Sequence, residues 1–345
     1  MTALDGAGRR RALILTAQIT IVAVATGATV GTLLSSDVRV GAVLGALASA
    51  LITVMLCGFE LVVMAGPLGR SLRRLPFFAL FLLRTAIYLA VAYLGFLASH
   101  GVILGDWSWT SFDRTRAWSL VYAGLFSIAV NFVMLVRRLA GPGVIARFVL
   151  GRYHHPRHER RYLLFLDMVG STGAAERLGP ERFHLLLNRV MYDIAGPVAA
   201  YGGEIHKYVG DEAIVTWLAA GSGIDPRPGA CALAIQEALA ARADAYVQEY
   251  GAPVRLRAGL HLGEVVTGEL GDQRQEIAML GDGINTAARL VDAARETGQA
   301  VVATVGSVDP AGLPAAWRVR PLGLVALRGK QAPLDLLALE RVPAD

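Results

Sequence analysis

The stretch Phe165-Leu166-Asp167-Met168-Val169-Gly170-Ser171-Thr172 decides how the second half of the chain folds. The apolar run 162–166 predicts a buried strand, and Asp167 places a carboxylate at its end. The small residues that follow predict the start of a helix, where free backbone N–H groups suit phosphate oxygens. The candidate substrate-binding residues of this turn are Val169, Gly170, Ser171 and Thr172.

A second motif, Lys207-Tyr208-Val209-Gly210-Asp211-Glu212, lies between two short predicted strands. This pattern predicts a β-hairpin with an acid at its turn. If the hairpin neighbours the first strand, Asp211 comes to lie beside Asp167, and two such carboxylates repel unless a cation separates them. Hard oxygen ligands favour Mg²⁺ or Mn²⁺. We therefore expect a metal site at Asp167, Met168 and Asp211.

The third motif is Gly281-Asp282-Gly283-Ile284-Asn285-Thr286-Ala287-Ala288-Arg289-Leu290. Asn285 and Arg289 are four residues apart, so they project from one face of the predicted helix. An amide and a guanidinium together suit a hydroxyl and a phosphate. An Asn–Arg pair at this spacing, taken alone, more often lies on a solvated helix face. The occurrence of all three motifs in this order is what favours one common site.

Strands and helices alternate throughout this half, which predicts an α/β or α+β domain around one sheet. The predicted strands are 162–166, 204–208, 213–217, 254–262, 264–269 and 276–280, and the predicted helices are 181–200, 228–250 and 284–296.

Composition sets the first half apart. The chain has 345 residues, of which 54% are hydrophobic and 18% charged, against about 25% charged in a typical soluble domain. These values exclude a disordered chain and argue against a wholly soluble protein. Four apolar stretches each approach the ~20 residues that cross a bilayer as a helix. They are Leu13–Ser35, Val40–Ala65, Leu75–Leu104 and Trp118–Val136.

The sequence thus predicts a four-helix transmembrane domain (1–136), a juxtamembrane linker (137–161) and a soluble domain (162–345). A fifth span remains an alternative if the third stretch is broken. Arginines gather before the first span, between the second and third, and after the fourth, which places both termini in the cytoplasm. The charges inside the spans, Glu60 and Arg84, either pair or reach the inner headgroups.

The basic residues point to a bacterial source. Only two of the 33 basic residues are lysines, Lys207 and Lys330, which is typical of GC-rich bacterial coding. The expected location is a bacterial inner membrane, with contacts to lipid and no nucleic-acid partner. An unidentified membrane or periplasmic ligand remains open.

The second half resembles the catalytic domain of class III adenylate/guanylate cyclases, of the membrane-bound bacterial type. The resemblance covers Tyr162–Glu340. It implies a ferredoxin-like α+β domain that works as a head-to-tail homodimer with active sites at the interface. Its signals are Phe165–Thr172, Gly203–Glu212, His261–Glu269 and Gly281–Leu290.

The resemblance also implies roles for individual residues. Asp167 and Asp211 match the aspartates that hold two Mg²⁺ or Mn²⁺ ions per site. Asn285 matches the residue that orients the ribose, and Arg289 the one that stabilises the transition state. The implied reaction is attack of the ribose 3′-hydroxyl of ATP on the α-phosphate, which gives cyclic AMP and pyrophosphate.

Both lysines fall on lysine positions of the family. Lys207 matches the purine-reading lysine and Lys330 one that holds the terminal phosphates. The chain departs from the family at Ala278, where adenine-reading members carry Asp, Thr or Ser; Glu276 shares its strand face. We expect ATP as substrate with lax purine choice. A guanylate cyclase, or a degenerate domain that only binds nucleotide, remains an alternative.

Overall fold

The structure is a computed structural model that divides into two compact units, Met1–Ala140 and Gly141–Asp345. The residues it describes are 6–59, 63, 67–72, 75–105, 117–118, 121–125, 127–129, 131–132, 153–272 and 275–342.

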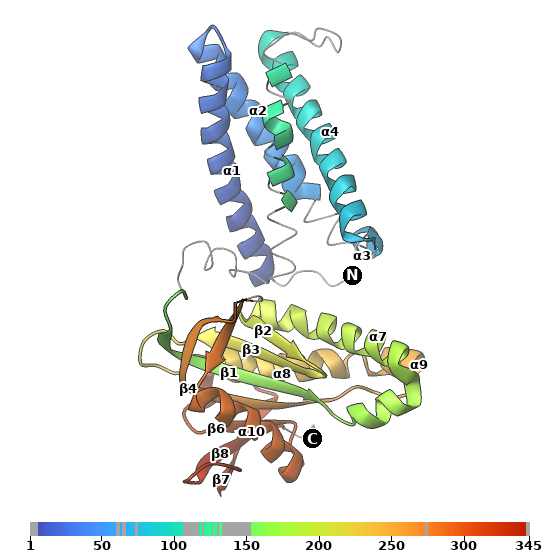
Figure 1. Cartoon of the computed structure of the whole chain (residues 1–345), viewed down its shortest axis with the longest axis vertical. Coiled ribbons are helices and arrows are strands. Elements are labelled where there is room, and N and C mark those ends of the chain that lie inside the picture. Colours follow the sequence, from blue (N-terminus) through green and yellow to red (C-terminus); the bar gives the residue numbers. More distant parts are fainter. Residues whose placement is uncertain are drawn as a thin grey trace. The chain divides into compact units, whose positions relative to one another are not determined.

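The first unit is helical. Its helices are α1 (Gly6–Leu34), α2 (Val38–Gly58), the short α3 (Pro67–Leu72) and α4 (Phe77–Leu104) (Figure 1). Two of them, α2 and α4, contain stretches long and apolar enough to cross a membrane, whereas the apolar part of α1 is shorter, Ile19–Leu34. The described residues therefore reproduce two of the four predicted spans. Most of the fourth, Trp118–Val136, lies outside them.

Glycines let α1 and α2 pack closely. A Cβ built on Gly31 would overlap the carbonyl oxygen of Gly41, and one built on Gly45 would overlap that of Gly27. Each helix thus contributes a small-xxx-small pair, the pattern that brings helix backbones together in lipid. Asp37 starts α2 because its side chain accepts hydrogen bonds from the backbone N–H groups at positions 39 and 40.

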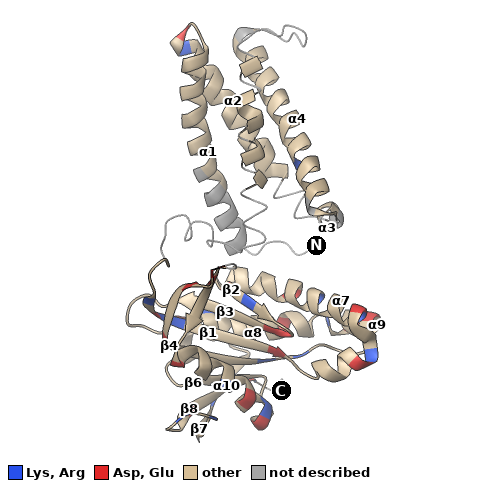
Figure 2. Ribbon diagram, in the orientation of Figure 1, with Lys and Arg blue, Asp and Glu red and all other residues tan. Residues whose placement is uncertain are grey.

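Few charges lie on the described helices of this unit (Figure 2). Arg84 in α4 is buried, at 6% exposure, and its Nη2 donates to the Tyr88 hydroxyl at 3.2 Å. Glu60 lies outside the described residues, so the two alternatives for Glu60 and Arg84, pairing or reaching the headgroups, stay predictions.

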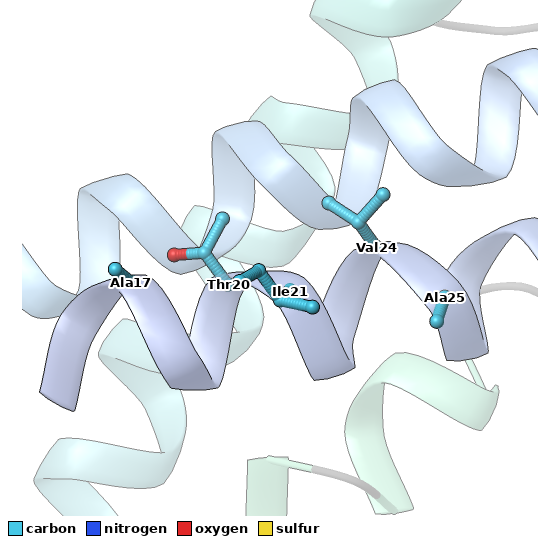
Figure 3. A pocket seen from close by; sticks show the side chains of 5 residues that line it. All are labelled: Ala17, Thr20, Ile21, Val24 and Ala25. Atoms are coloured by element: carbon cyan, nitrogen blue, oxygen red, sulfur yellow. The ribbon is translucent and has the colours of Figure 1, made fainter. Parts of the chain in front are cut away.

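A shallow hollow runs along the outside of α1. The side chains that line it are Ala17, Thr20, Ile21, Val24 and Ala25, all from this one helix (Figure 3). Because a single helix face forms it, the hollow is apolar surface and lacks the enclosing walls of a ligand pocket.

The second unit is built on one mixed sheet. Its strand order is β2-β3-β1-β4-β6-β8-β7, with β5 paired to β4, and β1 runs antiparallel to both of its neighbours. The strands are β1 (Arg157–Met168), β2 (Glu204–Val209), β3 (Glu212–Leu218), β4 (Leu256–Leu270), β5 (Glu276–Leu280), β6 (Val301–Thr304), β7 (Trp317–Val325) and β8 (Leu334–Arg341).

Helices cover both faces of this sheet, as the alternation of side chains along β1 requires. Tyr162, Leu164 and Leu166 pack against α7 (Ser171–Ala200) and α8 (Pro226–Ala240), while Leu163 and Phe165 pack against α10 (Asp282–Thr297) on the opposite face (Figure 1). The β-α-β-β-α-β order with β1 central is ferredoxin-like, which confirms the predicted α+β class.

Several elements differ from the expectation, and α7 already begins at Ser171, ten residues before the predicted start of its helix. β1 begins at Arg157, before the predicted domain start at 162, and Tyr153 is already buried. The two strands predicted around Gly263 are one, because β4 pairs with β1 without interruption through the Arg161–Gly263 register. The helix predicted over 228–250 is two, α8 and α9 (Ala243–Tyr250).

A buried carboxylate holds α9 against α7. The side chain of Asp193 is fully buried; it accepts a hydrogen bond from the Tyr246 hydroxyl at 2.9 Å and pairs with Arg242 and, at 3.3 Å, with Arg189. The burial of Tyr246 and its bond to Asp193 raise the pKa of that phenol. The two arginines remain partly exposed.

We expect Asp193→Ala to lower the unfolding free energy by about 2–3 kcal/mol, less than the ~3–5 kcal/mol of a fully buried pair, because both arginines can turn to water. The midpoint of thermal unfolding should fall by about 5–10 °C, measured by circular dichroism on the purified protein. Glu181→Ala, an exposed change in α7, is the control. An unchanged midpoint for Asp193→Ala would contradict this role.

Candidate functional site

Sheet pairing brings the two predicted aspartates together. Asp167 is the penultimate residue of β1 and Asp211 lies in the turn between β2 and β3, where Gly210 adopts a φ of 61°. The β1–β3 register pairs Leu166 with Ala213, so the turn comes to lie beside the end of β1. Burial and the nearby Asp211 charge raise the pKa of the Asp167 carboxyl.

Two arginines that the sequence reasoning missed face Asp167. Nη2 of Arg295, near the end of α10, is 3.5 Å from Asp167 Oδ2, and Nη1 of Arg257 in β4 is 4.0 Å from it. Burial, together with Asp167 and Asp211, also raises the pKa of Glu212. The end of β1 is therefore a concentrated group of carboxylates that two guanidinium groups partly neutralise.

This donor set fits a divalent cation. The pKa values of the Asp167 and Glu212 carboxyls are raised first by burial and then by neighbouring carboxylates, and a bound cation would favour the ionised form of both. In the part of the chain that the structure describes, no three His, Cys, Asp or Glu residues form a metal-binding group. Mg²⁺ in proteins is commonly held by one or two carboxylates plus water and substrate phosphates. The Met168 side chain is buried, so this residue offers only its backbone carbonyl.

The turn after Asp167 presents backbone amides. Gly170 precedes α7 with a φ of 71° and caps the helix without a side-chain hydrogen bond. The Ala174 N–H bonds to the Gly170 carbonyl, and among the described residues the amides of 171–173 before it have no backbone partner. The Val169 N–H is already bonded to the Arg255 carbonyl at 3.0 Å. Of the predicted turn, Gly170, Ser171 and Thr172 thus have amides without a backbone partner among the described residues, and these can bind phosphate.

Close packing on β4 positions Asn285 and Arg289. A Cβ on Gly283 would come within 2.6 Å of the Glu264 carbonyl oxygen, and one on Gly259 within 2.7 Å of Leu290 Cβ, so these glycines let α10 lie directly on the strand. Asn285 is exposed and Arg289 is half-buried. Within the described residues, neither side chain has a hydrogen bond or an ion pair.

Both lysines pair with acids that begin an element, Glu276 at the start of β5 and Asp282 at the start of α10. Lys207 Nζ is 3.1 Å from both carboxylate oxygens of Glu276, and Lys330 pairs with Asp282. Burial and the Lys330 charge lower the pKa of the neighbouring His261 to about 4. Ala278 lies opposite Gly268 in the β4–β5 ladder and is half-buried.

The predicted residues therefore form separate groups within one chain. Among the described residues, no hydrogen bond or ion pair joins the aspartates to Lys207, Arg289 or Lys330. α10 explains this separation, because a helix rises ~1.5 Å per residue and so places Asn285 about 15 Å along the axis from Arg295, whose guanidinium contacts Asp167.

Sequence comparison identifies this arrangement. Residues 153–335 match the family model described as the adenylate and guanylate cyclase catalytic domain. The chain belongs to this family. The cyclase domain so defined contains all the site residues discussed above, and the class predicted from the motifs is confirmed.

Relatives and solved structures agree with this assignment. The cyclase is 33% identical over 304 residues to Adenylate cyclase 2 of Rhizobium meliloti (strain 1021), which covers 87% of this chain and 84% of the relative. Residues 153–345 cannot account for an alignment of that length, so the similarity extends into the helical unit. Adenylate cyclase 1 of the same organism is 30% identical over 50% of this chain but only 26% of its own length. A bacterial light-regulated adenylyl cyclase structure shares the fold, with a TM-score of 0.51, 18% identity and coverage of 64% and 62% of the two chains.

We expect Asp167→Asn and Asp211→Asn each to remove the rise in thermal unfolding midpoint that Mn²⁺ produces in the wild-type cyclase, because binding to the native state stabilises it. Without metal, neither variant should unfold earlier than wild type, since each relieves repulsion between like charges. The measurement is thermal unfolding with and without Mn²⁺.

The matched control is Asp335→Asn, which alters an exposed aspartate of β8. It should keep the full stabilisation by Mn²⁺. A normal Mn²⁺ response in either site variant would contradict the metal assignment.

Proposed function

We propose that the chain is a membrane-bound adenylate cyclase that converts ATP to 3′,5′-cyclic AMP and pyrophosphate. The observation that carries this proposal is the crowding of Asp167 and Asp211 beside the free amides at the start of α7. A cation site next to a phosphate-binding turn suits a nucleoside triphosphate. Membership of the cyclase family and the similarity to Adenylate cyclase 2 of Rhizobium meliloti support it.

Each group then has a distinct task. Asp167 and Asp211 would hold two divalent ions, with the Met168 carbonyl as a further ligand. When bound, Mg²⁺ or Mn²⁺ activates the ribose 3′-hydroxyl and neutralises the triphosphate. The amides of Ser171 and Thr172 bind phosphate oxygens. The 3′-hydroxyl attacks the α-phosphorus in line and gives its proton to solvent water; the bond from the 3′-oxygen to the α-phosphorus forms as the bond to pyrophosphate breaks.

The remaining residues act on the ribose and the phosphates. Asn285 orients the ribose through its amide, and Arg289 offsets the charge that grows on the α-phosphate. Both side chains lie free of partners within the described part of the chain, which suits groups that engage substrate. Lys330 binds the terminal phosphates once it leaves Asp282, and Lys207 reads the purine.

The active unit is a homodimer with two shared sites. The helical distance between Asn285 and the end of α10 separates the ribose group from the metal group within one chain. A two-fold partner can supply the missing group to each site, because both chains present the same surface. Exposed apolar side chains on the hairpin and on the β4–β5 ladder offer a surface for that contact. These are Tyr208, Val209, Leu270 and Leu280, at 48%, 47%, 52% and 56% exposure.

The helical unit anchors the enzyme in a bacterial inner membrane through four spans, with both termini and the cyclase domain in the cytoplasm. The spans within α2 and α4 support this, as does the alignment with Adenylate cyclase 2 that extends beyond the catalytic domain. The distribution of arginines around the apolar stretches sets the orientation.

The direct test is product formation by the purified full-length protein with Mn²⁺ and either ATP or GTP, followed by chromatography. We expect cyclic AMP from ATP in amounts equal to the pyrophosphate released, and less product from GTP. Guanylate cyclase activity is the second candidate, because Ala278 offers no polar side chain to the base. Dominant cyclic GMP would favour it, and no cyclic product from either nucleotide would contradict the proposed function.

A further inference from the structure

Lys207 and Glu276 form an ion pair between strands that are not hydrogen-bonded neighbours. Lys207 lies in β2 at one edge of the sheet, whereas Glu276 begins β5, whose partner among the described strands is β4. The ammonium nitrogen is 3.1 Å from both carboxylate oxygens. A β-bulge between Ile205 and Lys207 shifts the β2–β3 register at this point. Bulges of this kind re-aim side chains next to active sites.

Stability does not explain this pair. The side chains of Lys207 and Glu276 are 46% and 41% exposed, and solvated ion pairs of this kind contribute little to folding. The chain nevertheless places one of its two lysines here, in a sequence that otherwise uses arginine. If the carboxylate of Glu276 were the sole partner, an arginine, with its two parallel donors, would suit it better than a lysine. The lysine at this position therefore favours a further ligand.

Glu276 supplies, beside Lys207, the hydrogen-bond acceptor that Ala278 lacks. Side chains alternate along a strand, so Glu276 and Ala278 lie on the same face of β5. Ala278 has no polar side chain, and a base bound against Lys207 finds no acceptor there. Glu276 supplies an acceptor on that same face, already in contact with the lysine.

The two groups together match one purine. At its Watson–Crick edge adenine offers the acceptor N1 next to the donor 6-amino group, whereas guanine has a protonated N1 next to the acceptor O6. A donating ammonium beside an accepting carboxylate complements adenine at both atoms. It opposes guanine at both, because the ammonium meets N1–H and the carboxylate meets O6.

We propose that Glu276, oriented by Lys207, accepts a hydrogen bond from the 6-amino group of adenine and is the residue that makes this cyclase prefer ATP. This rests on the proposed function and sharpens it. It also replaces the expectation of lax purine choice drawn from Ala278 alone. Glu276 is two residues before the position where the family usually carries its base-reading side chain.

The test measures binding of nucleotides that cannot cyclise. Full-length wild type, Glu276→Ala and Glu276→Gln are titrated with 3′-deoxy-ATP, 3′-deoxy-GTP and the 3′-deoxy triphosphate of unsubstituted purine riboside, all with Mn²⁺, by calorimetry. The purine riboside differs from adenosine only in lacking the 6-amino group. Wild type should bind 3′-deoxy-ATP about ten- to a hundredfold more tightly than either competitor, the range for a hydrogen bond to a charged group.

Glu276→Ala should lose most of that preference against both competitors. Glu276→Gln keeps the size of the side chain but can offer guanine a donor, so it should relax the preference against 3′-deoxy-GTP in particular. Adding Ala278→Thr to Glu276→Ala introduces a hydroxyl on the same face and should recover part of the preference for ATP. Glu181→Ala, an exposed change in α7, should bind all three nucleotides as wild type does.

An unchanged preference for 3′-deoxy-ATP over the purine riboside analogue in both Glu276 variants would overturn the proposal. So would a wild type that does not distinguish these two. The same preparations are assayed for cyclic AMP from ATP. If the preference depends on Glu276 but no cyclic product forms, the base-reading role stands and the proposed function fails; the reverse result rejects only the role of Glu276.

Discussion

The approach of Asp211 to the buried carboxylate of Asp167 is the constraint on which the proposed site depends. Two carboxylates come together at the end of β1 only because the antiparallel pairing of β1 with β3 fixes the hairpin turn beside it. Burial and mutual charge raise the pKa of Asp167, so the fold holds these groups in an arrangement that their electrostatics oppose. The hydrophobic core on both faces of β1 supplies that rigidity, and Arg257 and Arg295 offset part of the charge. A divalent cation, as proposed, would offset it more completely.

The same rigid packing keeps the proposed metal ligands apart from the residues proposed to bind ribose and base within one chain. α10 packs directly on β4 over Gly259 and Gly263, so its position on the sheet is fixed. The residues at its two ends therefore stay in different parts of the domain. At the end of α10, Arg295 contacts Asp167. At its start, close to Asn285 in the sequence, Asp282 pairs with Lys330. Lys207–Glu276 and Lys330–Asp282 keep both lysines oriented within one chain. Under the proposed function, a nucleotide that contacts the metal, ribose and base groups at once would therefore be bound by two chains.

Much of this was predictable from local sequence patterns. The strand before Asp167, the hairpin around Gly210 and the helix that carries Asn285 and Arg289 follow from apolar runs, turn residues and helical spacing. Contacts that depend on strand register could not be predicted from the sequence. Nothing in the sequence tells that Asp167 pairs opposite Arg257, or that a bulge before Lys207 accompanies its contact with Glu276. The break between α8 and α9 at Ala241–Arg242 was missed because neither Gly nor Pro marks it. The anchor was only partly reproduced, since two described helices contain spans of sufficient length.

Complementation between two inactive chains tests the central claim, that each chain carries two half-sites, most directly. Asp167→Ala and Arg289→Ala are expressed separately and together, and cyclic AMP is measured at equal membrane insertion. Each homodimer should be inactive because both of its sites are broken. In a heterodimer both changes fall in one site and leave the other intact, so co-expression should recover activity, up to one working site per heterodimer. If well-inserted, pairing-competent variants recover nothing on co-expression, the metal and transition-state groups come from the same chain and the account is wrong.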